Sequence, residues 1–468
     1  DFQDDIFTMH KDKKTIILAC PLSFDQLSIL EEHGMNKSSR LIVETFLQRS
    51  YPHENFASHT LGYLHKKDNI GIVGIEKICN ELLGGHVGLN QAIVMANGTV
   101  LESNTLQAAQ EGQDIIITID YNIQKIAESI LPQDVAGSVI VINPETGALR
   151  ALVSSPRFNP EDFVHGIDQQ MWKELHDKKA LVNRCFQGLY SPGSLFKMIV
   201  MVAALEEGLI KEDSQWFCSG SLHFKGRDYR CNKKTGHGKI DIRSALMYSC
   251  NIPFYHLAST NLTIDALAKY ATMFGFGTNS MHYFNDRSGL VPCGKWKRET
   301  FKTAWYKGET LSVSIGQGSL TVTPLQIARM HSAIMTGYLI QPRILQTDPI
   351  VKTPLPLHHA TLRAMREAIY MGVQRGTSQA LKSLLSEWDI YAKTGTIQVV
   401  QMQENSYEEG GPKHNQHHGA IAVYLKHKIY GEPLVLVIIA EHIGSSKIAA
   451  SYARSFIVQL AQTYKKKS

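Results

Sequence analysis

Three short motifs in this chain carry residues suited to acyl transfer. They are Ser194-Leu195-Phe196-Lys197, Ser249-Cys250-Asn251 and Lys393-Thr394-Gly395-Thr396. A serine hydroxyl is a weak nucleophile at neutral pH and needs a base within hydrogen-bond reach. A lysine three residues later on a helix lies on the same face as the serine. The first motif therefore predicts that Ser194 attacks an acyl group and that Lys197 accepts its proton.

The sequence around Ser194 favours this chemistry. Residues 195–205 are apolar almost throughout, with Lys197 as the one basic residue, which predicts a helix buried on all sides. At the start of that helix, unpaired N–H groups and the positive dipole end stabilise negative charge on the Ser194 oxygen. Burial disfavours the charged form of Lys197, as a lysine base requires. The alternative is an N-cap serine and a lysine that reaches the surface.

The third motif lies in a β-rich stretch that predicts a strand interrupted by a glycine. Gly395 permits close approach of another backbone, so an acylated peptide could pair along this edge. Lys393 and Thr394 would then bind a terminal carboxylate. The N–H of Thr396 would join that of Ser194 as an oxyanion donor. An ordinary exposed strand end is the alternative.

The second motif follows a predicted helix over residues 242–248. Ser249 would relay a proton to Lys197, and Asn251 would hold the substrate amide. Both residues could instead cap or turn the chain.

In order and context, the three motifs resemble those of the penicillin-binding protein and serine β-lactamase superfamily. Further segments resemble class B penicillin-binding proteins of the elongation type, penicillin-binding protein 2. Two features depart from that pattern: the second motif reads Cys250-Asn251, and residues 401–418 form a long polar segment. The resembling segments are residues 49–52, 62–63, 74–77, 137–149, 183–188, 288–292, 296–297, 314–318 and 321–326.

The resemblance implies a peptidoglycan D,D-transpeptidase that cross-links stem peptides through an acyl-enzyme on Ser194 and that β-lactam antibiotics acylate. It further implies a role in cell elongation and no cofactor for catalysis. The implied partners are a membrane-embedded glycan polymerase and a rod-shape scaffold protein, both bound through the N-terminal region. Two alternatives stay open: a D,D-carboxypeptidase or β-lactamase that hydrolyses its acyl-enzyme, and a non-catalytic β-lactam sensor or assembly scaffold.

With 468 residues, 43% of them hydrophobic, the chain is long enough for two or more domains. Strands near residue 140 and near the C-terminus, with helices between them, predict an α+β fold in which helices cover both faces of an antiparallel sheet. The resemblance adds an elongated N-terminal α/β pedestal. We expect the pedestal over residues 1–130 and the transpeptidase domain over residues 131–468. The pedestal region is too short for an additional glycan-polymerising domain.

Hydrophobic periodicity and turn residues predict the individual elements. The expected strands are residues 114–119 and two hairpins, 138–142 with 149–154 and 420–425 with 434–440. The expected helices include residues 38–50, 121–131 and 449–464.

A net charge of +5, from 48 basic and 43 acidic residues, is too even a balance to indicate a nucleic-acid partner. No window of 18 uninterrupted apolar residues predicts a membrane span. The resemblance implies a location on the periplasmic side of the inner membrane, with an anchoring helix upstream of Asp1.

Seven cysteines suggest a separate site. Cys218, Cys231, His237 and Cys250 lie in a turn-rich stretch that leads into the second motif, and three thiolates with one imidazole would form a closed tetrahedral zinc site. Such a zinc ion would be structural. Free buried thiols, a disulfide and chance are the alternatives. His414, His417 and His418 form a second cluster, for which a solvated loop is the preferred interpretation.

Overall fold

A computed structural model describes residues 23–32, 48–66, 69–95, 100–398 and 416–465 of the chain. The chain divides into two compact units, residues 1–50 with 85–112 and residues 51–84 with 113–468. The smaller unit holds helix α1 (Phe24–Glu32) and a hairpin of β1 (Leu89–Val94) and β2 (Val100–Gln107). The expected domain boundary at residue 130 stays a prediction. Among the described helices, none combines the length and the hydropathy that a bilayer span requires.

The larger unit contains the three motifs. Its helices are α2 (Ser58–Leu61), α3 (Gly74–Ile78), α4 (Asn80–Gly84), α5 (Tyr121–Ser129), α6 (Glu161–His165), α7 (Gln169–Asp177), α8 (Arg184–Gln187), η2 (Gly193–Leu195), α9 (Lys197–Glu206), α10 (Ile242–Met247), α11 (Ile252–Ser259), α12 (Ile264–Met273), η3 (His282–Phe284), α13 (Gly294–Phe301), α14 (Lys307–Ser314), α15 (Pro324–Thr336), α16 (His359–Arg375), η4 (Gln379–Leu384) and α17 (Ser446–Lys465). Its strands are β3 (Gly137–Ile142), β4 (Leu149–Ser155), β5 (Gln215–Cys218), β6 (Ser221–Phe224), β7 (Arg227–Arg230), β8 (Gly238–Asp241), β9 (Tyr338–Ile340), β10 (Lys352–Pro354), β11 (Trp388–Ile397), β12 (His418–His427) and β13 (Leu434–Ala440).

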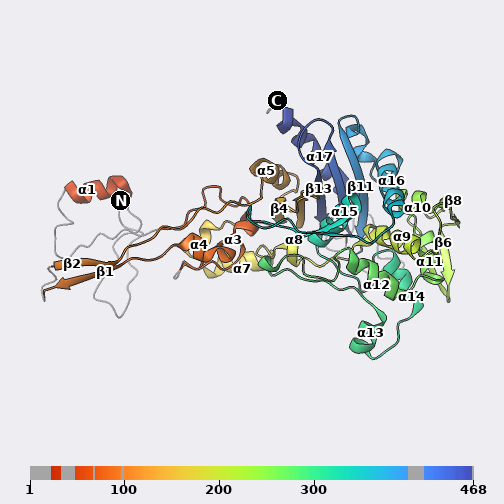
Figure 1. Cartoon of the computed structure of the whole chain (residues 1–468), viewed down its shortest axis with the longest axis horizontal. Coiled ribbons are helices and arrows are strands. Elements are labelled where there is room, and N and C mark those ends of the chain that lie inside the picture. The colour runs from red at the N-terminus through yellow and green to blue at the C-terminus, as the bar shows by residue number, and fades with distance from the viewer. Residues whose placement is uncertain (1–22, 33–47, 67–68, 96–99, 399–415, 466–468) are drawn as a thin grey trace. The chain divides into compact units, whose positions relative to one another are not determined.

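Five strands form one antiparallel sheet in the order β11-β12-β13-β3-β4. Both faces of the sheet are covered, because successive side chains of β13 enter different hydrophobic cores. Val435 and Val437 face the core that contains α9 and α15. Leu436 and Ile438 face the core that contains α5 and α17. The layers can be followed in Figure 1, where α17 and α15 lie on opposite sides of β13. The expected α+β class, with helices on both faces of an antiparallel sheet, is confirmed.

Most expected elements of the larger unit are present, and one is wrong. Helices α5 and α17 and the hairpins β3–β4 and β12–β13 match their expected positions within a few residues. Residues 114–119 do not form a strand. Only Ile117 makes an isolated bridge, to Leu345, where the N–H of Thr118 donates to the backbone oxygen of Ile344 at 2.7 Å. The expected helix over residues 38–50 falls mainly outside the described residues, and residues 48–50 are not helical.

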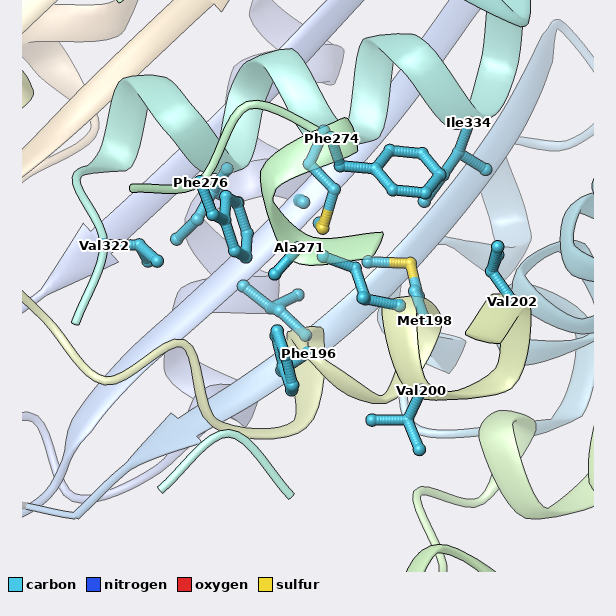
Figure 2. Packing of buried hydrophobic residues seen from close by; sticks show 14 of the residues in the cluster. Phe196, Met198, Val200, Val202, Ala271, Phe274, Phe276, Val322 and Ile334 are labelled. Atoms are coloured by element: carbon cyan, nitrogen blue, oxygen red, sulfur yellow. The ribbon is translucent and has the colours of Figure 1, made fainter. Parts of the chain in front are cut away.

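Helix α9 is buried on every side, as its composition predicts. Residues 197–204 are all fully buried. Figure 2 shows Met198 and Val202 on the side of this helix that faces Phe274 and Ile334, and Val200 on its opposite side. The ring of Phe196 stacks on that of Phe276 with centroids 6.2 Å apart. This packing fixes the helix that carries Lys197, so that the lysine points from a rigid support.

Candidate active site

The candidate nucleophile lies on a tight turn that leads into α9. Ser194 belongs to the 3-10 turn η2 and is partly exposed, whereas its neighbours Gly193 and Leu195 are buried. Gly193 has a φ of +54°, and its N–H donates to the backbone oxygen of Gly316 at 2.9 Å. A Cβ at Gly193 would lie 2.5 Å from the backbone oxygen of Thr396. The turn is therefore held between β11 and the segment around Gly316.

Lys197 lies one residue beyond this turn and is fully buried. Its Nζ donates to the backbone oxygen of Ser249 at 2.7 Å and to Oδ1 of Asn251 at 2.6 Å. Burial lowers the pKa of Lys197 to about 8, although the nearby thiols of Cys250 and Cys231 oppose that shift. A lysine with this pKa supplies an appreciable neutral fraction at physiological pH.

Ser249 connects the first and third motifs. Its hydroxyl accepts a hydrogen bond from Lys197 at 3.3 Å and another from Lys393 at 3.1 Å. The residue follows α10 with a φ of +56°, a left-handed conformation that is uncommon for a residue other than glycine. This turn directs the Ser249 carbonyl toward Lys197 and the Ser249 hydroxyl toward both lysines, and local backbone strain of this kind is found at functional sites.

The third motif lies on β11, as expected for a strand. Lys393 is buried, and its Nζ also donates to the backbone oxygen of Thr394 at 2.9 Å. Burial holds the pKa of Lys393 well below its ordinary value, and the charge of Lys197 adds to the effect. Two ammonium groups that share one serine hydroxyl repel each other, so the pair favours a state with fewer than two protons.

The structure adds one residue that the motifs do not indicate. Thr394 donates from Oγ1 to Oγ1 of Thr377 at 2.7 Å. The backbone N–H of Thr377 donates to the oxygen of Met247, next to the second motif, at 3.3 Å. Thr377 therefore joins the second and third motifs. Residues 376–378 follow the C-terminus of α16, and a Gly-Thr-Ser turn gives no signal that it enters a site.

The structure thus brings Lys197, Ser249, Asn251 and Lys393 into one hydrogen-bonded group, with Ser194 one turn away. No hydrogen bond joins Ser194 to Lys197 in the part of the chain that the structure describes. Gly395 and Thr396 border the nucleophile turn: a Cβ at Gly395 would lie 3.2 Å from the backbone oxygen of Pro192. The catalytic and substrate-binding roles of these residues stay predictions.

The expected metal-ligand residues also lie together. The Sγ atoms of Cys218 and Cys231 are 3.6 Å and 3.5 Å from Nδ1 of His237, and Cys231 Sγ is 3.7 Å from Cys250 Sγ. All four ligand atoms lie within 4.8 Å of one another. The cluster joins the end of β5 and the segment between β7 and β8 to the turn that carries Ser249.

The second histidine cluster is not a solvated loop in its described part. His417 is buried, and His418 begins β12, where its Nδ1 accepts from the backbone N–H of His442 at 2.9 Å. Burial lowers the pKa of His418 to about 4. His414 and most of the polar segment 401–418 lie outside the described residues.

Comparison with known proteins shows which family the chain belongs to. Residues 137–429 match the model of the penicillin binding protein transpeptidase domain. The chain belongs to this penicillin-binding protein family. Residues 3–117 match the model of the penicillin-binding protein dimerisation domain. The two domains together are those of class B penicillin-binding proteins, so the expected family membership is confirmed.

Individual relatives point to the penicillin-binding protein 2 branch. The peptidoglycan D,D-transpeptidase MrdA of Acinetobacter baumannii is 33% identical over 86% of this chain, and the match covers 65% of that protein's length. The chain therefore spans slightly less than two thirds of this relative. Among solved structures, penicillin-binding protein 2 of Helicobacter pylori in complex with MreC has a TM-score of 0.83 at 27% identity, covering 96% of this chain and 85% of that one. Pseudomonas aeruginosa PBP2 in complex with WCK 5153 has a TM-score of 0.75 at 27% identity, and the match covers 89% of this chain and 91% of that one.

Proposed function

We propose that this penicillin-binding protein is a D,D-transpeptidase that cross-links peptidoglycan stem peptides. The observation that carries the proposal is the Ser249 hydroxyl, which lies 3.3 Å from Lys197 Nζ and 3.1 Å from Lys393 Nζ beside the Ser194 turn. An acyl transfer of this kind needs a proton path from the nucleophile to the leaving amine. Two buried lysines that share one hydroxyl provide such a path.

In the acylation step, Ser194 Oγ attacks the carbonyl carbon of a D-Ala-D-Ala bond and transfers its proton to neutral Lys197. The proton then passes through Ser249 to the nitrogen of the terminal D-Ala, which leaves as the carbon–nitrogen bond breaks. Thr394 holds the terminal carboxylate, and the N–H groups of Ser194 and Thr396 stabilise the oxyanion. In the second step an amine of another strand attacks the ester, an amide forms, and Ser194 Oγ regains its proton.

A β-lactam fits the same scheme, because its strained amide acylates Ser194 and leaves no separate amine to depart. The fold and the branch of the relatives support a role in cell elongation on the periplasmic side of the inner membrane. They also support partners of the two expected kinds, a membrane-embedded glycan polymerase and a rod-shape scaffold protein, which would bind through the N-terminal region over residues 1–130. The transpeptidase domain would then span residues 131–468.

Labelling with a fluorescent penicillin tests the proposal directly. We expect one covalent label per chain, and peptide mass analysis should locate it on the peptide that contains Ser194. A label on another residue, or no label at concentrations that saturate a known penicillin-binding protein, would overturn the assignment. If transfer and labelling were lost in Ser194→Ala but wall synthesis in cells continued, the sensor or scaffold function would explain the protein better.

A hydrolase on this scaffold needs a base that activates water against the acyl-enzyme. In the described part of the chain, no carboxylate forms a hydrogen bond with the side chains of Ser194, Lys197, Ser249 or Lys393. That arrangement favours a long-lived acyl-enzyme over rapid hydrolysis. Release of the fluorescent label within seconds would instead favour the carboxypeptidase or β-lactamase.

We further propose that Cys218, Cys231, His237 and Cys250 hold a structural zinc ion. A tetrahedral zinc with typical bond lengths separates two sulfur ligands by about 3.8 Å and a sulfur from a nitrogen by about 3.5 Å. The corresponding distances here are 3.7 Å between two sulfurs and 3.5 Å and 3.6 Å between sulfur and nitrogen. The hydrogen bond between the two thiols lowers the pKa of Cys231 and raises that of Cys250, so the pair favours a state with one thiolate before a metal binds.

Metal analysis tests the zinc proposal without reference to activity. We expect about one zinc per chain in protein purified without chelator, and tetrahedral cobalt spectra with thiolate charge-transfer bands after cobalt substitution. Cys250→Ser should lower the metal content and the thermal midpoint. Cys293→Ser is the matched control, because Cys293 caps α13 outside the cluster and serine is also a good N-cap residue. Zinc-free protein, or equal metal content in both variants, would refute the proposal.

A further inference from the structure

A short segment beside the second motif is strongly basic. Residues 225–239 contain six basic residues and one acidic residue, a net charge of +5, which equals the net charge of the whole chain. All six basic side chains are exposed. We call this segment, which runs from the β6–β7 turn to the start of β8, the basic rim; its basic residues are Lys225, Arg227, Arg230, Lys233, Lys234 and Lys239.

The basic rim contacts the active-site turn directly. The Asn251 amide donates from Nδ2 to the backbone oxygen of Arg230 at 2.8 Å. On the other side of Ser249, the Asn232 amide donates to the backbone oxygen of Tyr248 at 3.2 Å. The residues that flank Ser249 are thus hydrogen-bonded to the middle of the rim. A ligand on the rim would lie next to an acyl group on Ser194.

Buried and aromatic residues within the rim anchor its backbone to the rest of the larger unit. The Tyr229 ring packs edge-on against that of Tyr255, with centroids 5.3 Å apart, and its hydroxyl donates to the backbone oxygen of Gly308 at 3.3 Å. Cys231 and His237 belong to the cysteine and histidine cluster. The backbone that carries the positive charges is therefore anchored at Tyr229, Cys231 and His237.

Most of these charges have no carboxylate partner. Across the described residues, Lys225, Arg227, Lys233, Lys234 and Lys239 form no ion pair with an acidic side chain. The single acidic residue of the rim, Asp228, accepts a hydrogen bond from His223 at 2.7 Å. Because like charges this close repel one another, an anionic ligand would be attracted to the rim and would relieve that repulsion.

The proposed reaction has a second substrate that the three motifs do not accommodate. The donor peptide is held by Thr394, Gly395 and Thr396 along β11, whereas the acceptor must bring an amine to the acyl carbon from another direction. A stem peptide ends in a free carboxylate, which is an anion at neutral pH. An acceptor that presents carboxylates is complementary in charge to the rim.

We propose that the basic rim is the binding surface for the acceptor strand, and that it binds the carboxylates of an acidic peptide whose amine attacks the Ser194 ester. This inference rests on the proposed transpeptidase function and adds the substrate class of its second step. The amine forms the new amide bond, the ester bond to Ser194 breaks, and the amine proton returns to the serine oxygen.

Two matched sets of substitutions test the rim. The rim variant carries Lys233→Gln, Lys234→Gln and Lys239→Gln, and the control variant carries Lys125→Gln, Lys173→Gln and Lys426→Gln. Both remove three positive charges from exposed lysines, so they change the net charge equally. The probe is a fluorescein-labelled pentapeptide with two glutamates and one free lysine amine, and its partner probe has glutamine in place of both glutamates.

Binding is measured by fluorescence anisotropy, which does not require acylation. For the acidic probe we expect about a tenfold higher Kd in the rim variant than in the parent or the control variant, and at about 0.5 M salt the difference should vanish. The glutamine probe should bind all three proteins equally weakly. Equal Kd values of the acidic probe in the rim and control variants would overturn the proposal.

A second measurement separates failure of the rim from failure of the proposed function. In this measurement a thioester donor acylates Ser194 and releases its thiol, and the products report how the acyl-enzyme partitions between the acidic amine and water. A lower ratio of aminolysis to hydrolysis in the rim variant alone supports the proposal. Absence of acylation in the parent would count against the transpeptidase function, while the anisotropy result would still decide whether the rim binds the acidic peptide.

If the rim variant lost binding to phosphatidylglycerol vesicles but bound the acidic probe normally, the rim would be a lipid-binding surface instead.

Discussion

Lys197→Met is expected to lower the rate constant for acylation by a fluorescent penicillin by about a thousandfold, in the range typical of a lost general base. The reason lies in the pKa of about 8 that burial gives Lys197. At pH 7 about 10% of such an amine is neutral, against about 0.03% of an ordinary lysine. No solvent base of similar strength can replace it, because the amine is fully buried.

The pH dependence follows from the same residue. The neutral amine is the active form, so acylation of the parent protein should increase with pH about tenfold per unit below pH 8 and level off above it. Lys197→Met should abolish that rise. Its thermal midpoint should stay within about 5 °C of the parent, because the lost hydrogen bonds to Ser249 and Asn251 are offset by removal of a buried ammonium group.

Lys269→Met is the matched control for this experiment. Lys269 is exposed on α12 and pairs with Glu207 at the C-terminal end of α9, and it makes no hydrogen bond with a described residue of the three motifs, so acylation should be unchanged. Ser194→Ala gives the baseline without covalent label. A Lys197→Met protein that retained more than about a tenth of the parent rate, or that kept the pH dependence, would exclude Lys197 as the base.

Gly316→Ala should also impair acylation strongly, by about a hundredfold, although residue 316 bears no reactive group. An added Cβ would lie 2.0 Å from the backbone oxygen of Gly193 and 2.7 Å from its nitrogen. Both contacts are with backbone atoms of the turn that presents Ser194, so no flexible side chain can move aside. The turn must shift, and a displacement of about 1 Å at a nucleophile costs on the order of a hundredfold in rate.

Gly318→Ala separates this clash from ordinary backbone strain. Gly316 and Gly318 both have positive φ, +74° and +78°, so alanine at either position meets a similar conformational cost. At Gly318 the nearest atom to a Cβ would be Ser312 Cβ at 3.6 Å, an ordinary contact. We expect similar thermal midpoints for the two variants but slow acylation only in Gly316→Ala. Equal acylation rates would show that the turn is not held by residue 316.

The residues that carry chemistry could be predicted from the sequence because each is marked by its immediate neighbours. Lys197 stands out as a lysine within an apolar helix, and Lys393 through Thr396 stand out as a charged and glycine-containing break in a strand. Strands with strictly apolar faces, such as β13, were also predictable, since a continuous hydrophobic run is typical of a strand buried on both sides. The cysteine and histidine cluster was predictable from residue types alone.

Contacts between segments that are far apart in the sequence could not be predicted from local patterns of residues. Thr377 enters the site only because the end of α16 lies against Met247, and no local pattern encodes that approach. The left-handed turn at Ser249 is likewise set by its surroundings, since serine itself does not favour a positive φ. Residues 114–119 have the composition of a strand, but the segment beside them pairs with them at one bridge only, between Ile117 and Leu345.

The strand order has a consequence for how the protein comes to be folded. Because β13 lies between β12 and β3, the hairpin of β3 and β4 has no link to the other three strands until residues 434–440 have been made. Nearly three hundred residues of translation, roughly fifteen seconds or more at bacterial speeds, separate the two halves of the sheet. During that interval the early hairpin exposes apolar side chains on both faces and an unpaired edge, a combination prone to aggregation. Production of this protein should therefore depend on chaperones that shield a nascent chain, more than its final stability would suggest.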